Sequence, residues 1–328
     1  MNAAATEVQR YADGVRAGDR KAVARTITLL ESTRREQTEL GQAILETLLP
    51  ETGRAIRLGI TGTPGVGKSS FIEICGLRLI EAGKRVAVLA VDPSSQISGG
   101  SILGDKTRME RLAQREQAFI RPSPSGGELG GVAHRTREAL LVCEAAGYDV
   151  VIVETVGVGQ SEAAVASMVD FFAVLLQPGA GDELQGLKKG ILEIADALVV
   201  NKADGPQALL AERTRAEHDS AVQLFRAQGV WRARVLKASA KTGEGIDAFW
   251  ETVLEHHRKV TASGALEQRR REQDRAWMWS LVKEGLDRGF REHPELNARV
   301  ASLEAEVARR EVAPATAARL LLELFRKG

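Results

Sequence analysis

The sequence has few of the residues that mark secreted or nucleic-acid-binding proteins. Its 328 residues include only two cysteines, Cys75 and Cys143, and each lies in a helical apolar pattern. This pattern favours two reduced core thiols over a disulfide. The 45 basic and 44 acidic residues leave a net charge of +1. Electrostatics therefore favour neither a nucleic acid nor an anionic membrane as a partner.

Targeting and metal-binding patterns are missing as well. The first residues, Met-Asn-Ala-Ala-Ala-Thr-Glu, lack the basic and apolar regions of a secretory signal. No stretch approaches the roughly twenty apolar residues that span a bilayer. The five histidines show no metal-ligand spacing, and we interpret the adjacent pair His256–His257 as solvated. These absences predict a cytoplasmic protein.

Residues 62–70 carry the clearest pattern in the sequence. The phosphate-binding loop G-x-x-x-x-G-K-[ST] is present at every fixed position, between a strand-like run at 56–61 and a helical pattern at 69–82. Glycines let successive backbone N–H groups point at phosphate oxygens, and the helix N-terminus adds its dipole. The alternative is a Gly-rich turn before an ordinary helix, which the strand–loop–helix context disfavours. The residues expected around the phosphates are Gly62, Thr63, Pro64, Gly65, Val66, Gly67, Lys68, Ser69 and Ser70.

Within this loop, Lys68 is predicted to reach the β- and γ-phosphates, and the Ser69 hydroxyl is predicted to ligate Mg²⁺. The chain is therefore expected to bind a nucleoside triphosphate.

A second motif, Asn201-Lys202-Ala203-Asp204, indicates which base is bound. The Asp204 carboxylate can accept hydrogen bonds from N1–H and the 2-amino group of guanine, whereas adenine has no such pair of donors. Asn201 is expected to tie this loop to the phosphate loop, and the Lys202 stem to lie along the base. These residues favour GTP and GDP over adenine nucleotides.

A third motif, Ser239-Ala240-Lys241, follows a strand-like run and supports the same choice. Its backbone amides are placed to donate to guanine O6. The tripeptide is weak evidence alone, but three motifs in this order predict a guanine-nucleotide site.

The order of expected elements divides the chain into three regions, 1–52, 53–260 and 261–328. The first is helical, and the second alternates strands and helices. The expected strands are 56–61, 86–91, 118–120, 149–153, 171–176, 197–200 and 234–238. Strands alternating with helices predict an α/β P-loop NTPase fold, with a mostly parallel sheet covered on both faces.

The region from 261 to 328 is predicted to be helical, with breaks near Pro294 and Pro314. Its apolar faces need something to bury against. Packing within the chain and dimerisation both satisfy that need, and the pattern alone does not separate them.

Acidic residues follow two of the expected strands. Asp92 and Glu154 each end a buried strand, and Asp105 lies in the Gly-rich stretch beyond the first of them. Acids placed beside a phosphate loop hold Mg²⁺ directly or through water. The predicted metal residues are therefore Ser69, Asp92, Asp105 and Glu154.

The predicted catalytic residues are Asp92, Lys68 and Lys188. The Gly157 N–H is expected to contact the γ-phosphate, and Val158 follows it where Ras-like enzymes have a glutamine that orients water. Intrinsic hydrolysis is therefore expected to be slow unless another group aligns the water, and Asp92 is the candidate. Lys188, in a further Gly-rich loop, can stabilise charge on the nucleotide or face solvent.

Several of these segments together resemble the MeaB/ArgK family of GTPases, which includes the human methylmalonic aciduria type A protein. The resemblance covers the α/β region closely and the helical ends less specifically. The segments that carry it are 62–70, V-D-P-S-S at 91–95, G-D-K-T-R-M at 104–109, R-P-S-P-S at 121–125, E-T-V-G-V-G-Q-S at 154–161 and N-K-A-D at 201–204.

The resemblance implies a chaperone of adenosylcobalamin-dependent methylmalonyl-CoA mutase, in which GTP binding and hydrolysis gate cofactor delivery and protect the mutase. It also implies a homodimer joined through the C-terminal arm, with the cobalamin adenosyltransferase as a further partner. Asp92 and Asp105 then belong to a first switch, Glu154 to the Mg²⁺ shell and 157–162 to a second switch. The loop 177–188, with Lys188, matches a third switch that responds to the partner.

A GTP-dependent regulator of another partner is the alternative, as in the transport role attached to the ArgK name. Kinase activity would need a phosphoacceptor site, and the sequence shows none.

Overall fold

The structure is a computed structural model, and it describes residues 3–91, 109–122, 129–155, 161–179, 189–224 and 229–326. The chain forms two compact units, Met1–Arg270 and Arg271–Gly328. Over the described ranges, no helix is long and apolar enough to cross a membrane.

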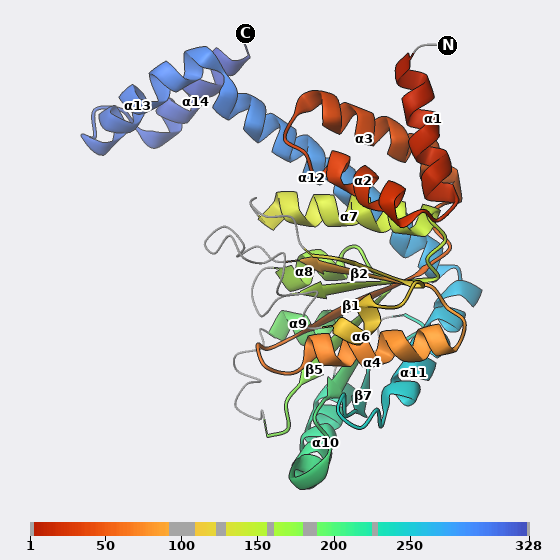
Figure 1. Cartoon of the computed structure of the whole chain (residues 1–328). Coiled ribbons are helices and arrows are strands. Elements are labelled where there is room, and N and C mark those ends of the chain that lie inside the picture. Colours follow the sequence, from red (N-terminus) through yellow and green to blue (C-terminus); the bar gives the residue numbers. More distant parts are fainter. Residues whose placement is uncertain are drawn as a thin grey trace. The chain divides into compact units, whose positions relative to one another are not determined.

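The first unit is built on one seven-stranded sheet with the strand order β3-β2-β4-β1-β5-β6-β7 (Figure 1). The strands are β1 (Ile56–Gly62), β2 (Val86–Val91), β3 (Ala118–Arg121), β4 (Val150–Thr155), β5 (Phe171–Leu176), β6 (Ala197–Val200) and β7 (Arg234–Lys237). Every neighbouring pair of these strands is parallel. The predicted α/β fold is confirmed, and all the predicted strands are present with only small shifts at their ends.

Helices cover both faces of the sheet, as Figure 1 shows for α4 below it and α7 above it. This arrangement follows from right-handed crossovers between parallel strands, which place helices on opposite faces when the chain moves in opposite directions along the sheet. The helices of this α/β region are α4 (Lys68–Glu81), α6 (Glu110–Ala113), α7 (Leu129–Ala145), α8 (Ser161–Ala166), α9 (Lys189–Ile194), η3 (Gly205–Gln207), α10 (Ala208–Leu224) and α11 (Ile246–Ala262).

The core lies between the sheet and these helices. Strands β2, β4, β5 and β6 are buried along their whole length, as expected for a parallel sheet with both faces covered. Phe249 of α11 makes edge contacts with Phe71 of α4 and Phe171 of β5, at centroid distances of 5.0 and 6.2 Å. These rings fix α4, which carries the phosphate loop at its start, against the sheet.

The prediction that both His256 and His257 are solvated is wrong for His256. Its side chain is buried, 1% exposed, and its ring lies 5.0 Å from the rings of both Phe171 and Trp231. The reason is helical spacing, because His256 shares the inner face of α11 with Phe249, Val253 and Val260. Burial, with a smaller contribution from Arg269, lowers the pKa of His256 to about 4.

Three N-terminal helices pack above α7 (Figure 1). They are α1 (Ala3–Arg16), α2 (Arg20–Leu30) and α3 (Arg35–Leu48), and the 3₁₀ turn η1 (Leu49–Glu51) follows them. The Asp19 side chain caps α2 by accepting a hydrogen bond of 2.9 Å from the Lys21 N–H. Gln42 of α3 donates to Glu138 of α7. The predicted helical extension is therefore joined to the α/β region.

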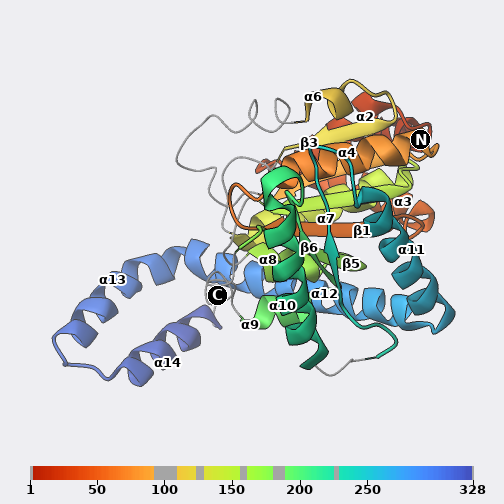
Figure 2. The same ribbon diagram turned by 90° about the horizontal axis from the view of Figure 1, so that it is seen from below.

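The second unit contains most of α12 (Ala265–Glu292), with α13 (Pro294–Ala308) and α14 (Pro314–Phe325), and these last two helices lie side by side (Figure 2). The breaks predicted at Pro294 and Pro314 are confirmed, because each proline begins a helix. Leu296, Leu303 and Ala317 are buried, and Phe290 contacts Phe325 at a centroid distance of 5.4 Å. Helix α12 buries no side chain completely, and Trp279 is 65% exposed.

Candidate nucleotide-binding site

The predicted phosphate and guanine loops meet at the carboxyl edge of the sheet. Strand β1 ends at Gly62 and leads through the loop to Lys68, the first residue of α4, while β6 ends one residue before Asn201. The two strands flank β5 in the same parallel sheet, so their carboxyl ends open on the same side. In open α/β sheets this edge is where ligands bind.

Glycines determine the path of the phosphate loop. Gly62, Gly65 and Gly67 have φ values of 151°, 79° and 94°, a region that favours glycine. A Cβ on Gly62 would lie 2.5 Å from the Leu175 carbonyl oxygen, and one on Gly67 would lie 2.9 Å from Asn201 Nδ2. No side chain caps the start of α4, so the N–H groups of its first turn are available to an anion.

Lys68 lies across this loop. Its side-chain Nζ donates to the Gly62 carbonyl at 2.7 Å and to the Thr63 carbonyl at 3.2 Å. The residue is only 7% exposed, so its ammonium group is held at the loop rather than in bulk water. This position fits the predicted contact with the β- and γ-phosphates.

The predicted metal residues Ser69 and Glu154 lie together. The Ser69 hydroxyl donates to Glu154 Oε1 at 3.1 Å, and Glu154 is 6% exposed at the end of β4. Beside them the Thr61 and Thr155 hydroxyls are 2.6 Å apart. These carboxylate and hydroxyl oxygen atoms are of the kind that Mg²⁺ prefers as ligands. The described part of the chain contains no cluster of three or more His, Cys, Asp or Glu side chains that could hold a metal ion.

Asn201 joins the two loops, as the sequence predicted. It is fully buried; its Nδ2 donates to the Val66 carbonyl at 2.9 Å, and its Oδ1 accepts from the Ala240 N–H at 3.2 Å. Lys202 has a φ of 58° and donates through Nζ to the Gly65 carbonyl at 2.7 Å. One side chain therefore connects the phosphate loop, the N-K-x-D loop and the S-A-K loop.

Asp204 is oriented by a hydroxyl whose role the sequence did not reveal. The Ser239 side chain donates to Asp204 Oδ1 at 2.7 Å and itself accepts from the Thr242 N–H at 3.1 Å. Ser239 is 1% exposed, so it holds the carboxylate in place beside Ala240 and Lys241. The S-A-K motif was the available signal, but it pointed to the backbone amides of this tripeptide and not to the serine hydroxyl.

Four predicted site residues lie outside the described residues: Asp92, Asp105, Gly157 and Lys188. The same is true of most of the switch segments predicted at 157–162 and 177–188. Their contributions to metal binding and catalysis therefore remain predictions.

Comparison with known proteins identifies the family. The model of the family described as methylmalonyl Co-A mutase-associated GTPase MeaB matches residues 23–295. The GTPase ArgK of Escherichia coli is 50% identical over 271 residues, which is 82% of each chain. The mitochondrial methylmalonic aciduria type A homolog of Mus musculus is 46% identical over 330 residues, covering 97% of this chain and 80% of the mouse protein.

A solved structure agrees with these sequence relatives. The crystal structure of a LAO/AO transport system kinase aligns with a TM-score of 0.80 at 38% identity and covers 99% of both chains. Its similarity extends over the helical ends as well as the α/β region. On these grounds, and on the guanine-nucleotide loops described above, the chain belongs to the MeaB family and is a GTP-hydrolysing enzyme.

Proposed function

We propose that this GTPase is a chaperone that gates adenosylcobalamin delivery to methylmalonyl-CoA mutase and protects that enzyme. The observation that supports the proposal is the family match, which covers residues 23–295 and carries the mutase in its description. The mouse relative, a methylmalonic aciduria type A homolog, points to the same metabolic setting.

The nucleotide half of the proposal depends on the contacts of Asn201 and Asp204. Asn201 forms hydrogen bonds to both neighbouring loops. The loop proposed to bind the base and the loop proposed to bind the phosphates are therefore held together. The Ser239 hydroxyl donates to Asp204 Oδ1 and so fixes the direction of the Asp204 side chain. The other carboxylate oxygen is then available to the guanine donors. A desolvated carboxylate without guanine donors would be costly, and this favours GTP and GDP over adenine nucleotides.

Magnesium is part of the proposal. Ser69 and Glu154 would hold the ion, together with Asp92 and Asp105. When bound, Mg²⁺ neutralises charge that develops on the phosphate oxygens. Glu154 also fixes the Ser69 hydroxyl through the hydrogen bond of 3.1 Å, so the two oxygen ligands are positioned by the protein.

Hydrolysis by the isolated protein is proposed to be slow. Val158 cannot orient water, and Asp92 and Lys188 would act only when a partner brings them to the nucleotide. Groups that orient water or stabilise developing charge each lower a barrier by a few kcal/mol. A partner that brings both groups into place would therefore raise the rate by about tenfold or more.

A homodimer through the C-terminal helices is also proposed. Trp279 and Leu286 of α12 are 65% and 58% exposed, and large exposed apolar side chains on one helix favour an interface. Trp279→Glu with Leu286→Glu should convert a dimer to a monomer in sedimentation velocity. Leu209→Glu, at a residue that is 68% exposed on α10, is the control and should leave the mass unchanged.

The decisive experiment measures GTP hydrolysis with and without purified methylmalonyl-CoA mutase from the same source. We expect stimulation of about tenfold or more, and Lys188→Ala should blunt it while GTP affinity stays nearly unchanged. An unrelated cobalamin enzyme serves as the control partner. Basal turnover that no mutase preparation accelerates would contradict the chaperone proposal.

That negative result would favour the second candidate, a GTP-dependent regulator of a different partner without kinase activity. The resemblance to ArgK at 50% identity supports keeping this candidate. Capture from native cytosol with a non-hydrolysable GTP analogue would then identify the partner.

A further inference from the structure

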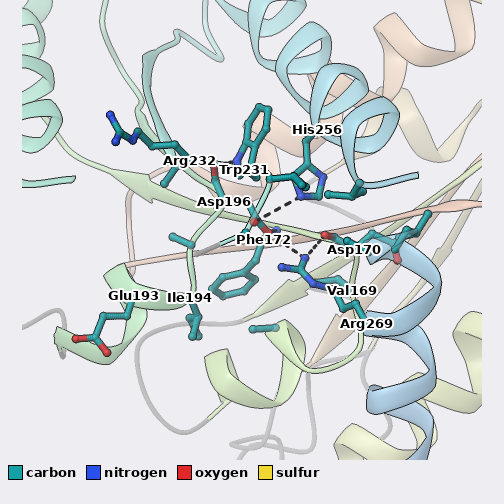
Figure 3. Close-up of a pocket in the computed structure, with 18 of the residues that line it drawn as sticks. Val169, Asp170, Phe172, Glu193, Ile194, Asp196, Trp231, Arg232, His256 and Arg269 are labelled. Atoms are coloured by element: carbon teal, nitrogen blue, oxygen red, sulfur yellow. Dashed lines mark hydrogen bonds and ion pairs between the residues drawn. The ribbon is translucent and has the colours of Figure 1, made fainter. Parts of the chain in front are cut away.

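A pocket of about 810 Å³ lies at the amino-terminal edge of β5 and β6, in the first unit (Figure 3). The nucleotide loops follow the carboxyl ends of the strands, so this pocket is a separate site. Its walls come from α8, the segments before β6 and β7, α11 and the first turns of α12. The volume falls in the range of small-molecule pockets, about 300–1,000 Å³.

The pocket wall is somewhat more apolar than polar. Ile194 and Val230 are 40% and 48% exposed, although both line the pocket. Exposed apolar side chains around a concavity favour an apolar occupant. The main apolar lining residues are Phe172, Ile194, Val230, Trp231, Val260 and Leu266.

The floor holds a carboxylate with few hydrogen bonds. Asp196 Oδ2 accepts from the Phe172 N–H at 2.9 Å and lies 3.6 Å from Arg269 Nη1. Its Oδ1 faces His256 Nε2 at 3.6 Å, beyond hydrogen-bond distance (Figure 3). The side chain is only 10% exposed, and a carboxylate can accept about four hydrogen bonds. The largely buried Asp196 carboxylate can therefore accept further hydrogen bonds.

His256 lies beside Asp196 at the pocket floor. The residue is 1% exposed, it lines the pocket, and its Nε2 is buried without a hydrogen-bond partner in the described structure. The neighbouring carboxylate favours the tautomer that carries the proton on Nε2. The Nε2 atom has almost no accessible surface, so an occupant of the pocket can reach the Asp196 carboxylate but not this nitrogen.

A neighbouring acid shows what a satisfied carboxylate looks like at this edge. Asp170 accepts from Arg270 Nε at 2.8 Å, from Arg270 Nη2 at 2.6 Å and from the Arg57 N–H at 2.9 Å. It has donors on both oxygens, while Asp196 has one direct hydrogen bond. The difference identifies Asp196 as the acid whose partner is still to be supplied.

We propose that this pocket binds a small apolar molecule whose uncharged head donates a hydrogen bond, such as a hydroxyl or a carboxamide. The head would donate to Asp196 Oδ1, while the apolar body contacts the wall. The floor charges favour an uncharged head, because Arg269 and Arg270 offset Asp170 and Asp196. At the mouth, the exposed Glu193 and Arg232 offset each other.

The test is a matched series of fluorinated probes observed by ¹⁹F NMR with the full-length protein. The series is 4-fluorobenzyl alcohol, 4-fluorotoluene, 4-fluorobenzylamine and 4-fluorobenzoate, which share a body and differ in the head. The alcohol should bind at least about tenfold more tightly than the other three, because a well-placed hydrogen-bonding pair in a buried site is worth about that factor. Equal binding of the alcohol and the toluene, or no binding of any probe, would overturn the proposal.

Variants locate the binding. Val230→Trp should fill the mouth and weaken the alcohol by about tenfold or more. Leu49→Trp is the matched control, because Leu49 and Val230 are both 48% exposed and only Val230 lines the pocket. Unchanged binding in Val230→Trp would show that the probe sits elsewhere and would overturn the site.

A second variant tests the head-group contact. Asp196→Leu, which has a similar size and no hydrogen-bonding group, should reduce the preference for the alcohol over the toluene to about twofold or less, with binding of the toluene nearly unchanged. Circular dichroism and the melting temperature report whether the variant is folded. A preference that survives in folded Asp196→Leu protein would exclude Asp196 as the acceptor and refute the proposal.

Discussion

The two edges of the central sheet place buried polar groups in different ways. At the carboxyl edge, Lys68 and Asn201 bond mainly to backbone carbonyl and amide groups of neighbouring loops. At the amino edge, Arg57 and Arg270 each pair with a buried carboxylate. Arg57 donates to both oxygens of Glu144 at 2.9 and 2.8 Å, and Arg270 donates to both oxygens of Asp170 at 2.8 and 2.6 Å.

This difference separates binding from structural support. Side chains held on backbone groups are positioned for a charged ligand, which can add stronger, charge-assisted hydrogen bonds. Side chains that already pair with opposite charges have few donors left for a ligand. Their role is to hold structural elements together. Arg270 also donates to the carbonyls of Gly53 and Ala55, so it joins the start of α12 to the segment before β1.

The largest expected effect comes from a substitution in the phosphate loop, at the carboxyl edge of the sheet. Lys68→Ala should weaken a GTP analogue by about a thousandfold, or about 4 kcal/mol, because it removes the fixed positive charge of the phosphate loop. Isothermal titration calorimetry measures this directly. Lys84→Ala, at the exposed lysine that follows the same helix, should bind normally. Affinity within threefold of the wild type in Lys68→Ala would refute the role of Lys68.

The next largest effect is expected from a substitution that disrupts an ion pair at the amino edge of the sheet. Arg270→Met keeps much of the apolar stem but leaves the buried Asp170 without its guanidinium. Removing one partner of a buried ion pair typically costs about 3–5 kcal/mol of folding free energy, and urea unfolding should show a loss of about 3 kcal/mol. GTP affinity should change little, since the nucleotide loops lie at the other edge. The exposed Arg258→Met is the control, and an equal loss there would remove the distinction.

A substitution of the base-recognition residue sharpens the comparison without breaking either edge. Asp204→Asn replaces an acceptor with a donor at the guanine 2-position. The variant should lose about thirtyfold in GTP affinity, about 2 kcal/mol, and should prefer xanthosine triphosphate. Competition binding with both nucleotides measures the switch. Unchanged GTP affinity would show that another group reads the base.

The smallest expected effect concerns pH and the amino edge. Burial raises the pKa of Asp196 to about 6 from 3.8. Between these values the folded state holds a proton that the unfolded state has lost, so stability falls as the pH rises. Burial, with Arg269, lowers the pKa of His256 to about 4 from 6.5, so its contribution rises with pH over nearly the same range. The two contributions oppose each other, and the wild type should depend only weakly on pH between 4 and 6.5.

Asp196→Asn removes the falling contribution and leaves that of His256. The free energy of unfolding of this variant should therefore increase between pH 4 and 6.5, by about 2 kcal/mol more than in the wild type. Urea titrations at several pH values measure the difference. Parallel pH profiles for the two proteins would show that Asp196 titrates normally.

Local patterns were enough for the sheet and for the nucleotide loops. Each buried strand is a continuous apolar run bounded by polar residues, so its place in the chain could be predicted from sequence. The loop from Gly62 to Ser69 is contiguous, and its chemistry requires specific residues at fixed spacing. Glu154 could be placed at the end of such a run, and its hydrogen bond with Ser69 shows that the two side chains lie together.

Contacts between distant residues could not be predicted in this way. Ser239 and Asp204 are separated by 35 residues, and nothing in either local pattern specifies that one hydroxyl orients the other carboxylate. The burial of His256 was not predicted for the same reason. Two adjacent histidines point from different faces of a helix, and the sequence alone does not show which face the rest of the protein covers.

The sequence by itself determined the fold class, the phosphate loop and the preference for guanine, since each depends on residues close together in the chain. Only the tertiary structure decided what lies at the amino edge. There, β5, β6, α11 and α12 bring Asp170, Asp196, His256 and Arg269 together from four separate segments. The physical reason is that hydrogen bonds and burial depend on distance in space, and a parallel sheet aligns strand starts that the chain keeps many residues apart.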